Sequence, residues 1–435
     1  MLKRKVLKAL EAWKSNKSKQ ALLVTGARQV GKTYIIREFG RKNYASFVEI
    51  NLLENAQARI AFNQAQTSED YLVAISLFAG DKLIENDTLI FIDEAQESKE
   101  IVTAIKFLVE RGGYDYVLSG SLLGVELNNI RSFPVGYLHS ISMYPLDFEE
   151  FCWARGVGES VFEEVRSCFF DKSAVPDYMH KHLLRLFHEY LVIGGLPDPV
   201  QIFVNDFDVQ KVRAIHDDIV ALYKKDISRY KEDRAREIKR IFDLIPSELN
   251  HKNKKFTIKS IDGIPRFDRY EDDFLWLVDA NVAIAAYCVS EPRHPLLLTA
   301  GENQFKLFLS DVGLLSSMCG IDTTREALTG NTSVNYGSFY ENAAAQELKA
   351  HNFTPYYYKD KDKGELDFVI ETRQGQVYPI EIKSGKNYKR HNALSNVLST
   401  TNFHVELAYV FCEKNISTNQ KLVYCPIYMI GCLES

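Results

Sequence analysis

The stretch Leu22-Leu-Val-Thr-Gly-Ala-Arg-Gln-Val-Gly-Lys-Thr33 decides how the first part of this 435-residue chain folds. Its segment from Gly26 to Thr33 has the spacing G-x-x-x-x-G-K-[ST], and it lies between the apolar run Ala21 to Thr25 and a helical pattern at 34–39. In a strand–loop–helix unit of this kind, backbone N–H groups curl around phosphates and the helix N-terminus points at them. The stretch therefore predicts a phosphate-binding loop after a buried strand. The alternative is a glycine-rich turn between a strand and a helix.

Individual loop residues have separate predicted roles. We expect Lys32 to neutralise the β- and γ-phosphates of ATP, and Thr33 to bind Mg²⁺. The glycines allow the backbone to approach the phosphates closely. The predicted nucleotide-binding residues of this segment are Gly26, Arg28, Gln29, Val30, Gly31, Lys32, Thr33 and Tyr34.

A second signal is the apolar run Thr88-Leu-Ile-Phe-Ile-Asp-Glu94, which reads as a buried strand that ends in two carboxylates. We expect Asp93 to hold Mg²⁺ through water and Glu94 to polarise the attacking water as a general base. The alternative is a core strand that simply ends in two exposed acids. A further strand at 116–118 leads into Ser119 and Ser121, and we expect a hydroxyl there to contact the γ-phosphate; the alternative is an ordinary turn.

Strands and helical stretches alternate over residues 20–150, which predicts a mainly parallel sheet flanked by helices. The strand candidates are Ala21 to Thr25, Phe47 to Asn51, Thr88 to Ile92, Tyr116 to Ser119 and His139 to Met143. Residues 1–19 are basic and repeat apolar side chains at helical spacing, so we expect an amphipathic opening helix packed on this domain. Its apolar positions are Val6, Leu7, Leu10 and Trp13.

Composition narrows the class of protein. Hydrophobic residues make up 46% and charged residues 26%, which is typical of a globular chain. No apolar run reaches the roughly 18 residues that a membrane span needs. The seven cysteines form no C-x-x-C pair, so we expect neither zinc nor a disulfide framework, and a cytoplasmic location. The net charge of −5 argues against a chain that coats nucleic acid generally, while a local basic face is still compatible with it.

The rest of the chain changes pattern twice. Residues 146–230 read as helical, and Gly194-Gly-Leu-Pro197 interrupts them with a strong turn signal. Residues 231–325 begin with a charged helix at 231–244, followed by two apolar helices and a hairpin-like pair from Asn303 to Leu315, which favours a winged helix. A basic cluster near it is a candidate DNA contact, with a solvated loop as the alternative. Its lysines are Lys252, Lys254, Lys255 and Lys259.

Four charged residues near the C-terminus share another pattern. Glu381 and Lys383 are two apart in an expected strand and therefore share a face, and Asp367 lies on the preceding strand. With Glu341 from a helix, the three carboxylates suit Mg²⁺ or Mn²⁺, and Lys383 suits the charge on a phosphate or the attacking water. The alternative is ordinary, because charged residues alternate in many half-exposed strands.

Several stretches also occur in one family in this order. They are Leu22 to Thr33, Ile90-Phe-Ile-Asp-Glu-Ala-Gln96, Leu118-Ser-Gly-Ser121, Tyr144-Pro-Leu-Asp-Phe-Glu-Glu-Phe151 and Gly194-Gly-Leu-Pro197. The chain resembles, nearly end to end, prokaryotic AAA-type P-loop ATPases with a C-terminal domain of unknown function similar to PD-(D/E)XK nucleases. One departure is Tyr137, where relatives commonly carry an arginine after a glycine. Arg131 is a nearby substitute, with an ordinary surface arginine as the alternative.

The resemblance implies an α/β chain of four parts. These are an AAA-like P-loop core at 1–150, a helical lid at 151–230, a winged-helix-like domain at 231–328 and a nuclease-like domain at 329–435. One functional hypothesis is an ATPase whose cycle gates a metal-dependent nuclease acting on DNA. The other is an ATP-dependent switch or binding module with a scaffold that does not cleave. ATPases of this class often complete their site with a neighbour's arginine, so a homo-oligomer is compatible with both.

Overall fold

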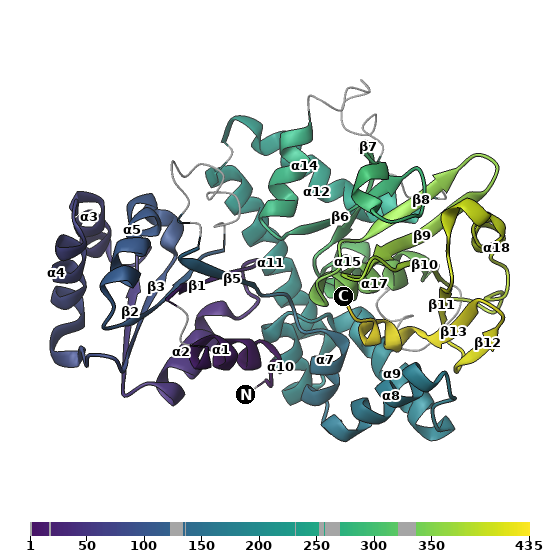
Figure 1. Ribbon diagram of the computed structural model, residues 1–435, viewed down its shortest axis with the longest axis horizontal. Coiled ribbons are helices and arrows are strands. Elements are labelled where there is room, and N and C mark those ends of the chain that lie inside the picture. The colour runs from purple at the N-terminus through teal and green to yellow at the C-terminus, as the bar shows by residue number, and fades with distance from the viewer. Residues whose placement is uncertain are drawn as a thin grey trace. The chain divides into compact units, whose positions relative to one another are not determined.

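Strand β1 (Ala21–Thr25), which precedes the glycine loop, lies inside a five-stranded sheet with the order β2-β3-β4-β1-β5 (Figure 1). Every pair of neighbouring strands in this sheet is parallel. The other strands are β2 (Ser46–Asn51), β3 (Thr88–Asp93), β4 (Asp115–Ser119) and β5 (Leu138–Ser142). The predicted parallel sheet is confirmed, with each strand end within one residue of the prediction.

The computed structural model describes residues 2–16, 19–121, 134, 136–230, 232–251, 256, 270–320 and 336–435. The chain forms two compact units. The N-terminal unit is Arg4–Tyr144 together with Asp279–Asn281, and the C-terminal unit is Pro145–Val278 and Val282–Ser435 together with the first three residues. None of the described helices combines the length and the apolar character that crossing a membrane requires.

Helices cover the parallel sheet because its central strands are apolar on both faces. Every residue of β3 is buried, as expected for a parallel strand covered on both sides. The helices of this unit are α1 (Val6–Ser15), α2 (Lys32–Asn43), α3 (Ala56–Gln64), α4 (Ser68–Ala79) and α5 (Lys99–Arg111). The opening helix is confirmed: Leu10 and Trp13 of α1 are buried, and the Trp13 ring contacts Phe39 of α2.

The C-terminal unit begins with helices, as predicted for residues 146–230. They are α7 (Phe148–Ala154), α8 (Glu159–Asp171), α9 (Asp177–Ile193), α10 (Pro197–Asp206) and α11 (Val209–Tyr230), followed by α12 (Ala235–Asn250) and α14 (Glu271–Asp279). Helix α9 ends at Gly194, whose φ of +70° favours glycine, and neither Gly194 nor Gly195 has room for a side chain. A Cβ on Gly194 would lie 2.1 Å from the Asp311 carboxylate, and one on Gly195 would lie 2.0 Å from the Leu146 carbonyl.

An eight-stranded sheet with the order β12-β13-β11-β10-β9-β8-β6-β7 forms the other half of this unit. Its strands are β6 (Ala283–Val289), β7 (Ala300–Leu309), β8 (Tyr356–Asp360), β9 (Gly364–Glu371), β10 (Val377–Ile382), β11 (Ala408–Cys412), β12 (Ser417–Asn419) and β13 (Leu422–Pro426). Its helices are α15 (Val312–Cys319), α17 (Gly337–Ala350) and α18 (Asn392–Ser399). Strands β8, β9 and β10 form an antiparallel meander, and β11 pairs with β10 in parallel.

The hairpin predicted from Asn303 to Leu315 is wrong. Strand β7 ends at Leu309, and Asp311 then caps α15 by accepting a hydrogen bond from the Leu314 amide. The partner of β7 is the preceding strand β6, which pairs in parallel with β8. The pattern of apolar residues was correct, but the capping aspartate turns the second half of the segment into a helix.

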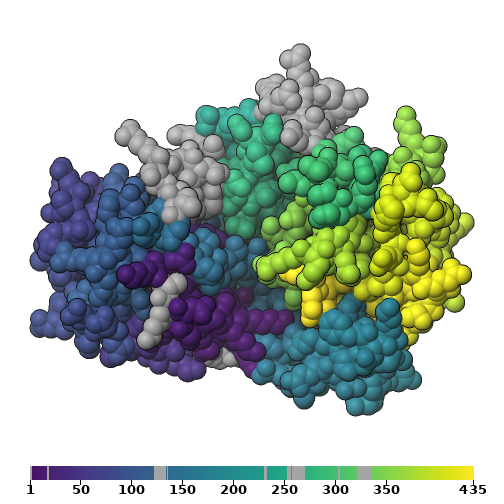
Figure 2. Space-filling view, in the orientation of Figure 1, coloured from purple at the N-terminus to yellow at the C-terminus, as the bar shows by residue number. Residues whose placement is uncertain are grey.

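Segments far apart in sequence are joined on one face of the C-terminal unit. The surface view shows residues of α8 and α9 beside the last strands (Figure 2). The Asn415 amide group accepts from the Val175 amide at 2.9 Å and donates to its carbonyl at 2.7 Å. The rings of Phe169 and Tyr409 stack at 5.7 Å. The helical segment and the last strands therefore share one packed body.

Candidate functional site

The glycine loop adopts the backbone conformation that its sequence predicts. Gly26 has φ +143° and Gly31 has φ +90°, both in the region that favours glycine. Gly31 is the N-cap of α2, so Lys32 and Thr33 are the first residues of the helix. The loop therefore joins the carboxyl end of β1 to a helix N-terminus, where a phosphate is stabilised by backbone amides and by the helix dipole.

Lys32 is folded back onto the loop. Its ammonium donates to the carbonyl oxygens of Gly26 and Ala27, both at 2.8 Å. Burial lowers the pKa of Lys32 to about 8, although attraction from Glu94 and Asp93 opposes this shift. A buried ammonium whose acceptors, among the described residues, are two loop carbonyls fits the role of a counter-charge for a phosphate, because phosphate oxygens would be stronger acceptors.

Two hydroxyls, from Thr33 at the start of α2 and Ser119 at the end of β4, meet the Asp93 carboxylate at the end of β3. Thr33 Oγ1 donates to Asp93 Oδ2 at 2.9 Å, and the Ser119 hydroxyl donates to the other oxygen of the same carboxylate. They meet because β4 lies between β1 and β3, and parallel strands end at the same sheet edge. Burial raises the pKa of Asp93, and the two hydroxyl hydrogen bonds oppose that rise. A hydroxyl beside a carboxylate is an oxygen donor set that suits Mg²⁺.

Glu94 follows Asp93 with a left-handed backbone, φ +53°, which is uncommon for a residue other than glycine. Its carboxylate accepts a hydrogen bond from the side chain of Gln96. Gln96 belongs to a motif quoted above, but nothing in that motif indicated that its side chain would hold Glu94. The left-handed turn ends the strand and sets the direction of the Glu94 side chain.

The other predicted nucleotide-binding residues differ in their contacts and in their exposure. Arg28 Nε donates to Ser121 Oγ at 3.1 Å, so two predicted nucleotide-binding residues contact each other. The Val30 carbonyl accepts from Arg4 at 3.1 Å, while the Tyr34 side chain is exposed. Gln29 has φ +66° and lies in the loop turn. Tyr137 donates its hydroxyl to Glu110, and Arg131 lies outside the described residues.

A glycine loop after β1, beside an acidic strand end on β3, defines a P-loop nucleotide-binding domain. Comparison with protein families agrees: residues 18–152 match a family described as AAA domain. Residues 18–152 are therefore a P-loop nucleotide-binding domain that is similar to AAA domains, and this fold implies the use of ATP with Mg²⁺. Residues 184–325 and 336–430 match two families described as domains of unknown function (DUF8612 and DUF4143).

Solved structures show only distant similarity over most of the chain. A Walker-type ATPase of Pyrococcus abyssi has a TM-score of 0.42 at 13% identity, over 74% of this chain and 96% of the other. A signal transduction ATPase with numerous domains and a tetratricopeptide repeat sensor, from Pyrococcus horikoshii, has a TM-score of 0.22 at 11% identity, over 81% of this chain and 62% of the other. The comparison with curated proteins finds no match.

Three of the four charged residues predicted near the C-terminus, Glu341, Asp367 and Lys383, line one pocket. A cavity of about 290 Å³ is lined by Gly337, Glu341, Asp367, Ile382, Lys383, Ser384, Gly385 and Asn387. Since Ile380 pairs with Phe368 across β10 and β9, the next position on each strand places Glu381 opposite Asp367. The Ile382 amide donates to Asp367 at 2.8 Å, and Lys383 donates to Glu381 at 2.5 Å.

Glu381, which contacts Lys383 of this pocket, has a strongly shifted pKa. Burial, with repulsion from Asp367, raises the pKa of Glu381 to about 8, and Lys383 opposes the rise. Although burial disfavours the charge on Lys383, Glu381 raises its pKa. Within the described ranges, the Glu341, Asp367 and Glu381 oxygens do not form a set that lies within 4.8 Å of one another. Glu341, Asp367 and Lys383 line the pocket and Glu381 contacts Lys383, but the three carboxylates do not stand at metal-ligand spacing.

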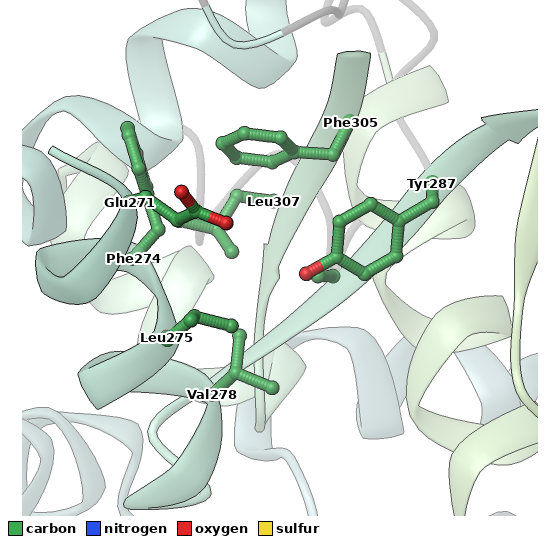
Figure 3. Close-up of a pocket in the computed structure, with 8 residues that line it drawn as sticks. Glu271, Phe274, Leu275, Val278, Tyr287, Phe305 and Leu307 are labelled. Atoms are coloured by element: carbon green, nitrogen blue, oxygen red, sulfur yellow. The ribbon is translucent and has the colours of Figure 1, made fainter. Parts of the chain in front are cut away.

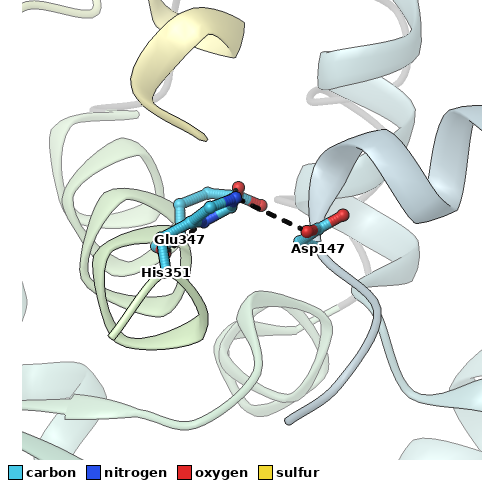
Figure 4. A group of neighbouring side chains, drawn as sticks. All are labelled: Asp147, Glu347 and His351. Carbon is cyan, nitrogen blue, oxygen red and sulfur yellow. Dashed lines mark hydrogen bonds and ion pairs between the residues drawn. The ribbon is translucent and has the colours of Figure 1, made fainter. Parts of the chain in front are cut away.

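Another cluster, which the sequence did not reveal, joins α7 to α17. Asp147, Glu347 and His351 place one ligand atom each within 4.8 Å of the others (Figure 4). Asp147 caps α7 through the Glu150 amide at 2.8 Å, and Glu347 accepts from the Phe148 amide at 2.6 Å. These hydrogen bonds account for the cluster as a joint between the two helices.

A smaller cavity of about 150 Å³ lies between α14 and the β6–β7 pair (Figure 3). Its walls are mostly apolar, and its acidic member is Glu271. The lining residues are Glu271, Phe274, Leu275, Val278, Ala285, Tyr287, Phe305 and Leu307. The basic cluster predicted near this region, Lys252, Lys254, Lys255 and Lys259, lies outside the described residues.

Proposed function

We propose that this chain binds and hydrolyses ATP with Mg²⁺ at the end of β1. The observation that carries the proposal is the contact between Thr33 Oγ1 and Asp93 at 2.9 Å, beside the buried ammonium of Lys32. A hydroxyl, a carboxylate and an ammonium at the mouth of a glycine loop are the groups that a metal-bound triphosphate requires.

Each residue has a task that its position allows. Lys32 exchanges the loop carbonyls for the β- and γ-phosphates, since charged acceptors bind an ammonium more strongly. Thr33 and Asp93 hold Mg²⁺, which supplies a positive charge next to the phosphates. Ser119 orients Asp93 from the neighbouring strand. Glu94, held by Gln96, accepts the proton of the attacking water.

Two substitutions separate binding from hydrolysis. Lys32→Ala should lose most ATP affinity, because the triphosphate loses its main counter-charge. Glu94→Gln should keep ATP affinity and slow turnover by about 10²-fold or more. Lys42→Ala is the control, because Lys42 lies on the same helix and its side chain is 78% exposed. Wild-type turnover in Glu94→Gln would remove Glu94 from the mechanism.

A second candidate function rests on the C-terminal pocket. We propose that Glu341, Asp367 and Glu381 bind Mg²⁺ or Mn²⁺ and that Lys383 positions the nucleophile of phosphodiester cleavage on DNA. The 290 Å³ pocket, which Glu341, Asp367 and Lys383 line and whose Lys383 contacts Glu381, supports this proposal. The 2.5 Å contact between Lys383 and Glu381 supports the alternative, a switch whose pocket does not cleave, since that contact occupies the lysine.

Cleavage assays on single- and double-stranded DNA, with and without ATP, decide between these alternatives. Asp367→Ala and Lys383→Ala should abolish metal-dependent cleavage while ATP turnover persists, because the two sites share no residue. Cleavage that survives in Asp367→Ala would assign the activity to a contaminant. No cleavage by the wild-type chain on any DNA would favour the switch. Gating by ATP requires, in addition, that Glu94→Gln changes the cleavage rate.

We also propose that the chain consists of an AAA-like core, a helical lid, a winged-helix-like domain and a nuclease-like domain. A further part of this proposal is that the chain assembles into a homo-oligomer. Oligomerisation would allow a neighbouring subunit to supply the arginine that Tyr137 replaces. Light scattering with and without an ATP analogue tests it. A monomer under both conditions, with full ATP turnover, would show that no neighbouring arginine is required.

A further inference from the structure

The cluster of Asp147, Glu347 and His351 brings two buried carboxylates and an imidazole together (Figure 4). Asp147 is 5% exposed and Glu347 is 2% exposed. His351 is the C-cap of α17 and follows Glu347 by one helical turn, so the two side chains lie on one face of that helix. Buried charges are costly unless they are paired or bind a metal ion, so the cluster calls for a cation.

The backbone amides at the start of α7 bind one oxygen of each carboxylate. Asp147 Oδ1 accepts from the Glu150 amide, and Glu347 Oε1 accepts from the Phe148 amide. The other oxygens face the imidazole: Asp147 Oδ2 lies 3.7 Å from Nε2 of His351, and Glu347 Oε2 lies 3.8 Å from Nδ1. The bonds that join the helices and the contacts with the imidazole therefore involve different atoms.

One hydrogen bond assigns a proton to the imidazole of His351. Its Nδ1 lies 2.9 Å from the Glu347 carbonyl oxygen, and because a carbonyl can only accept, Nδ1 is the donor. In the neutral ring Nε2 then carries a lone pair, and it faces an acceptor, Asp147 Oδ2. Two acceptors that face each other need a cation between them. A histidine that binds a metal through Nε2 usually donates its Nδ1–H to a carbonyl or a carboxylate in this way.

The spacing favours a metal ion over a proton as that cation. An N–H···O hydrogen bond spans about 2.7–3.2 Å, so the 3.7 Å between Nε2 and Asp147 Oδ2 is too long for one. Zn²⁺ binds imidazole nitrogen and carboxylate oxygen at about 2.0–2.2 Å, which places two ligands of a tetrahedral site about 3.4 Å apart. Two carboxylates also match the two charges of Zn²⁺, whereas a protonated His351 would balance one of them.

Gly431, in the 3-10 helix η7 (Ile427–Cys432), leaves space beside the same atoms. A Cβ there would lie 3.0 Å from Glu347 Oε2 and 3.0 Å from Cε1 of His351. Gly431 does not have positive φ, so its backbone conformation does not require glycine. The missing side chain therefore serves the space next to the carboxylate and the imidazole.

We propose that Asp147 Oδ2, Glu347 Oε2 and His351 Nε2 bind one Zn²⁺ ion that ties the start of α7 to the end of α17. An imidazole suits Zn²⁺ better than Mg²⁺ or Ca²⁺, which prefer oxygen ligands. Water completes the four-coordinate site from the side of His351, whose side chain is partly exposed. The prediction of no zinc rested on cysteine spacing, and none of these ligands is a cysteine.

Zinc titration by calorimetry tests this site on the full-length chain, which is first treated with EDTA and kept free of nucleotide. The wild type should bind one Zn²⁺ that depends on His351. His351→Gln should weaken this binding by at least about tenfold, because even the loss of a group that orients a ligand costs that much. Asp147→Asn should weaken it similarly and keep the helix cap, since asparagine caps helices as well as aspartate does.

Two glycine variants and a stability assay separate metal binding from damage to the fold. Gly431→Ala keeps all three ligands and narrows the space beside them, so it should weaken Zn²⁺ binding. Gly301→Ala is the matched control, because its Cβ would lie 3.7 Å from the Cys288 carbonyl oxygen, an ordinary contact. Zn²⁺ should also raise the urea midpoint of the wild type and leave that of Asp147→Asn unchanged, since a ligand stabilises only the form that binds it.

Two results would refute the site. One is a folded wild-type chain that binds no Zn²⁺. The other is zinc binding that His351→Gln, Asp147→Asn and Gly431→Ala all leave unchanged, which would assign the ion to a different place on the chain. If either ligand variant fails to fold, Gly431→Ala against Gly301→Ala decides, and equal zinc affinities of those two variants would then overturn the proposal.

Discussion

Gly26→Ala is the substitution for which the structure gives the sharpest expectation at the nucleotide site. The backbone at Gly26 has φ +143°, and a Cβ there would lie 2.2 Å from the carbonyl oxygen of Met143. Ordinary contact begins at 3.4 Å, so the two groups would have to separate by 1.2 Å. The Met143 amide also donates to the Thr25 carbonyl at 2.8 Å, and this separation would disturb that hydrogen bond.

The cost can be estimated from these parts. A non-glycine residue with such a backbone costs about 1–3 kcal/mol. Forcing overlapping groups apart in a packed site adds about 1–3 kcal/mol. We therefore expect Gly26→Ala to lower the free energy of unfolding of the N-terminal unit by about 2–6 kcal/mol. Because the loop amides move with Gly26, ATP affinity should fall by at least about tenfold.

Gly112→Ala is the matched control. Gly112 also has positive φ, at +74°, but a Cβ there meets nothing within 4 Å. It should cost only the backbone strain, about 1–3 kcal/mol, and leave ATP affinity unchanged. The assays are urea unfolding followed by circular dichroism and titration with a fluorescent ATP analogue. Equal stability of the two variants, with ATP affinity retained in Gly26→Ala, would refute the close packing of the loop on Met143.

Three further substitutions test other parts of the structure. Ser119→Ala removes the hydroxyl that donates to Asp93, so ATP turnover should fall by about 10- to 100-fold in a steady-state assay, and unchanged turnover would contradict this role. Burial lowers the pKa of His216 to about 4, below its unfolded value of 6.5, so its contribution to stability is present above pH 6.5 and lost on acidification. Urea unfolding should show about 2 kcal/mol less stability at pH 5 than at pH 7.5 from this group, and His216→Gln should remove that difference. Asp311→Asn leaves a buried backbone N–H without an acceptor and should cost about 1–3 kcal/mol in the same assay, whereas Asp208→Asn, whose bonds face water, should cost less.

The nucleotide site could be predicted from sequence because its signals are local. The loop, the strand before it and the helix after it lie within one short segment, so the residues that bind phosphate are neighbours in the chain. Predicting the contact between Thr33 and Asp93 required one long-range inference, namely that β3 lies in the same parallel sheet as β1. The buried apolar run at 88–92 indicated this. Ser119 was placed in the same way.

The C-terminal pocket was predicted in part. The spacing of Glu381 and Lys383 placed them on one face, and Asp367 joined them across the strand pair. The contact of the buried Lys306 on β7 with Glu365 could not be foreseen, because a single lysine in an apolar strand carries no sign of the distant acid that it contacts. Strand β7 itself had been assigned to a hairpin with the segment that becomes α15. Pairing partners depend on the whole sheet, and the sequence of one strand does not identify them.

The glycine motif at 194–197 explains packing and not chemistry. The Leu146 amide donates to the Gly195 carbonyl at 2.6 Å, and the Gly195 amide donates to Asp311 at 2.6 Å. The same buried joint includes Gln346 of α17, which accepts from the Val312 amide at 3.0 Å. Glycine is required at 195 because any side chain would strike Leu146, and a buried carboxylate is required at 311 to satisfy the amides around it.

This joint connects segments that the sequence assigned to different domains. Asn342 of α17 donates to the Leu309 carbonyl at 3.0 Å and accepts from its amide at 2.8 Å, so the end of β7 is tied to the helix that carries Glu341. Lys306 lies on the same strand, three residues before this contact. The contact of the buried Lys306 with Glu365 at 2.9 Å therefore joins the segment matched at 184–325 to the segment matched at 336–430. Gln346 of α17 donates to the Tyr190 hydroxyl of α9 at 2.8 Å, so a change of shape in the helical segment would reach α17, which carries Glu341 of the C-terminal pocket.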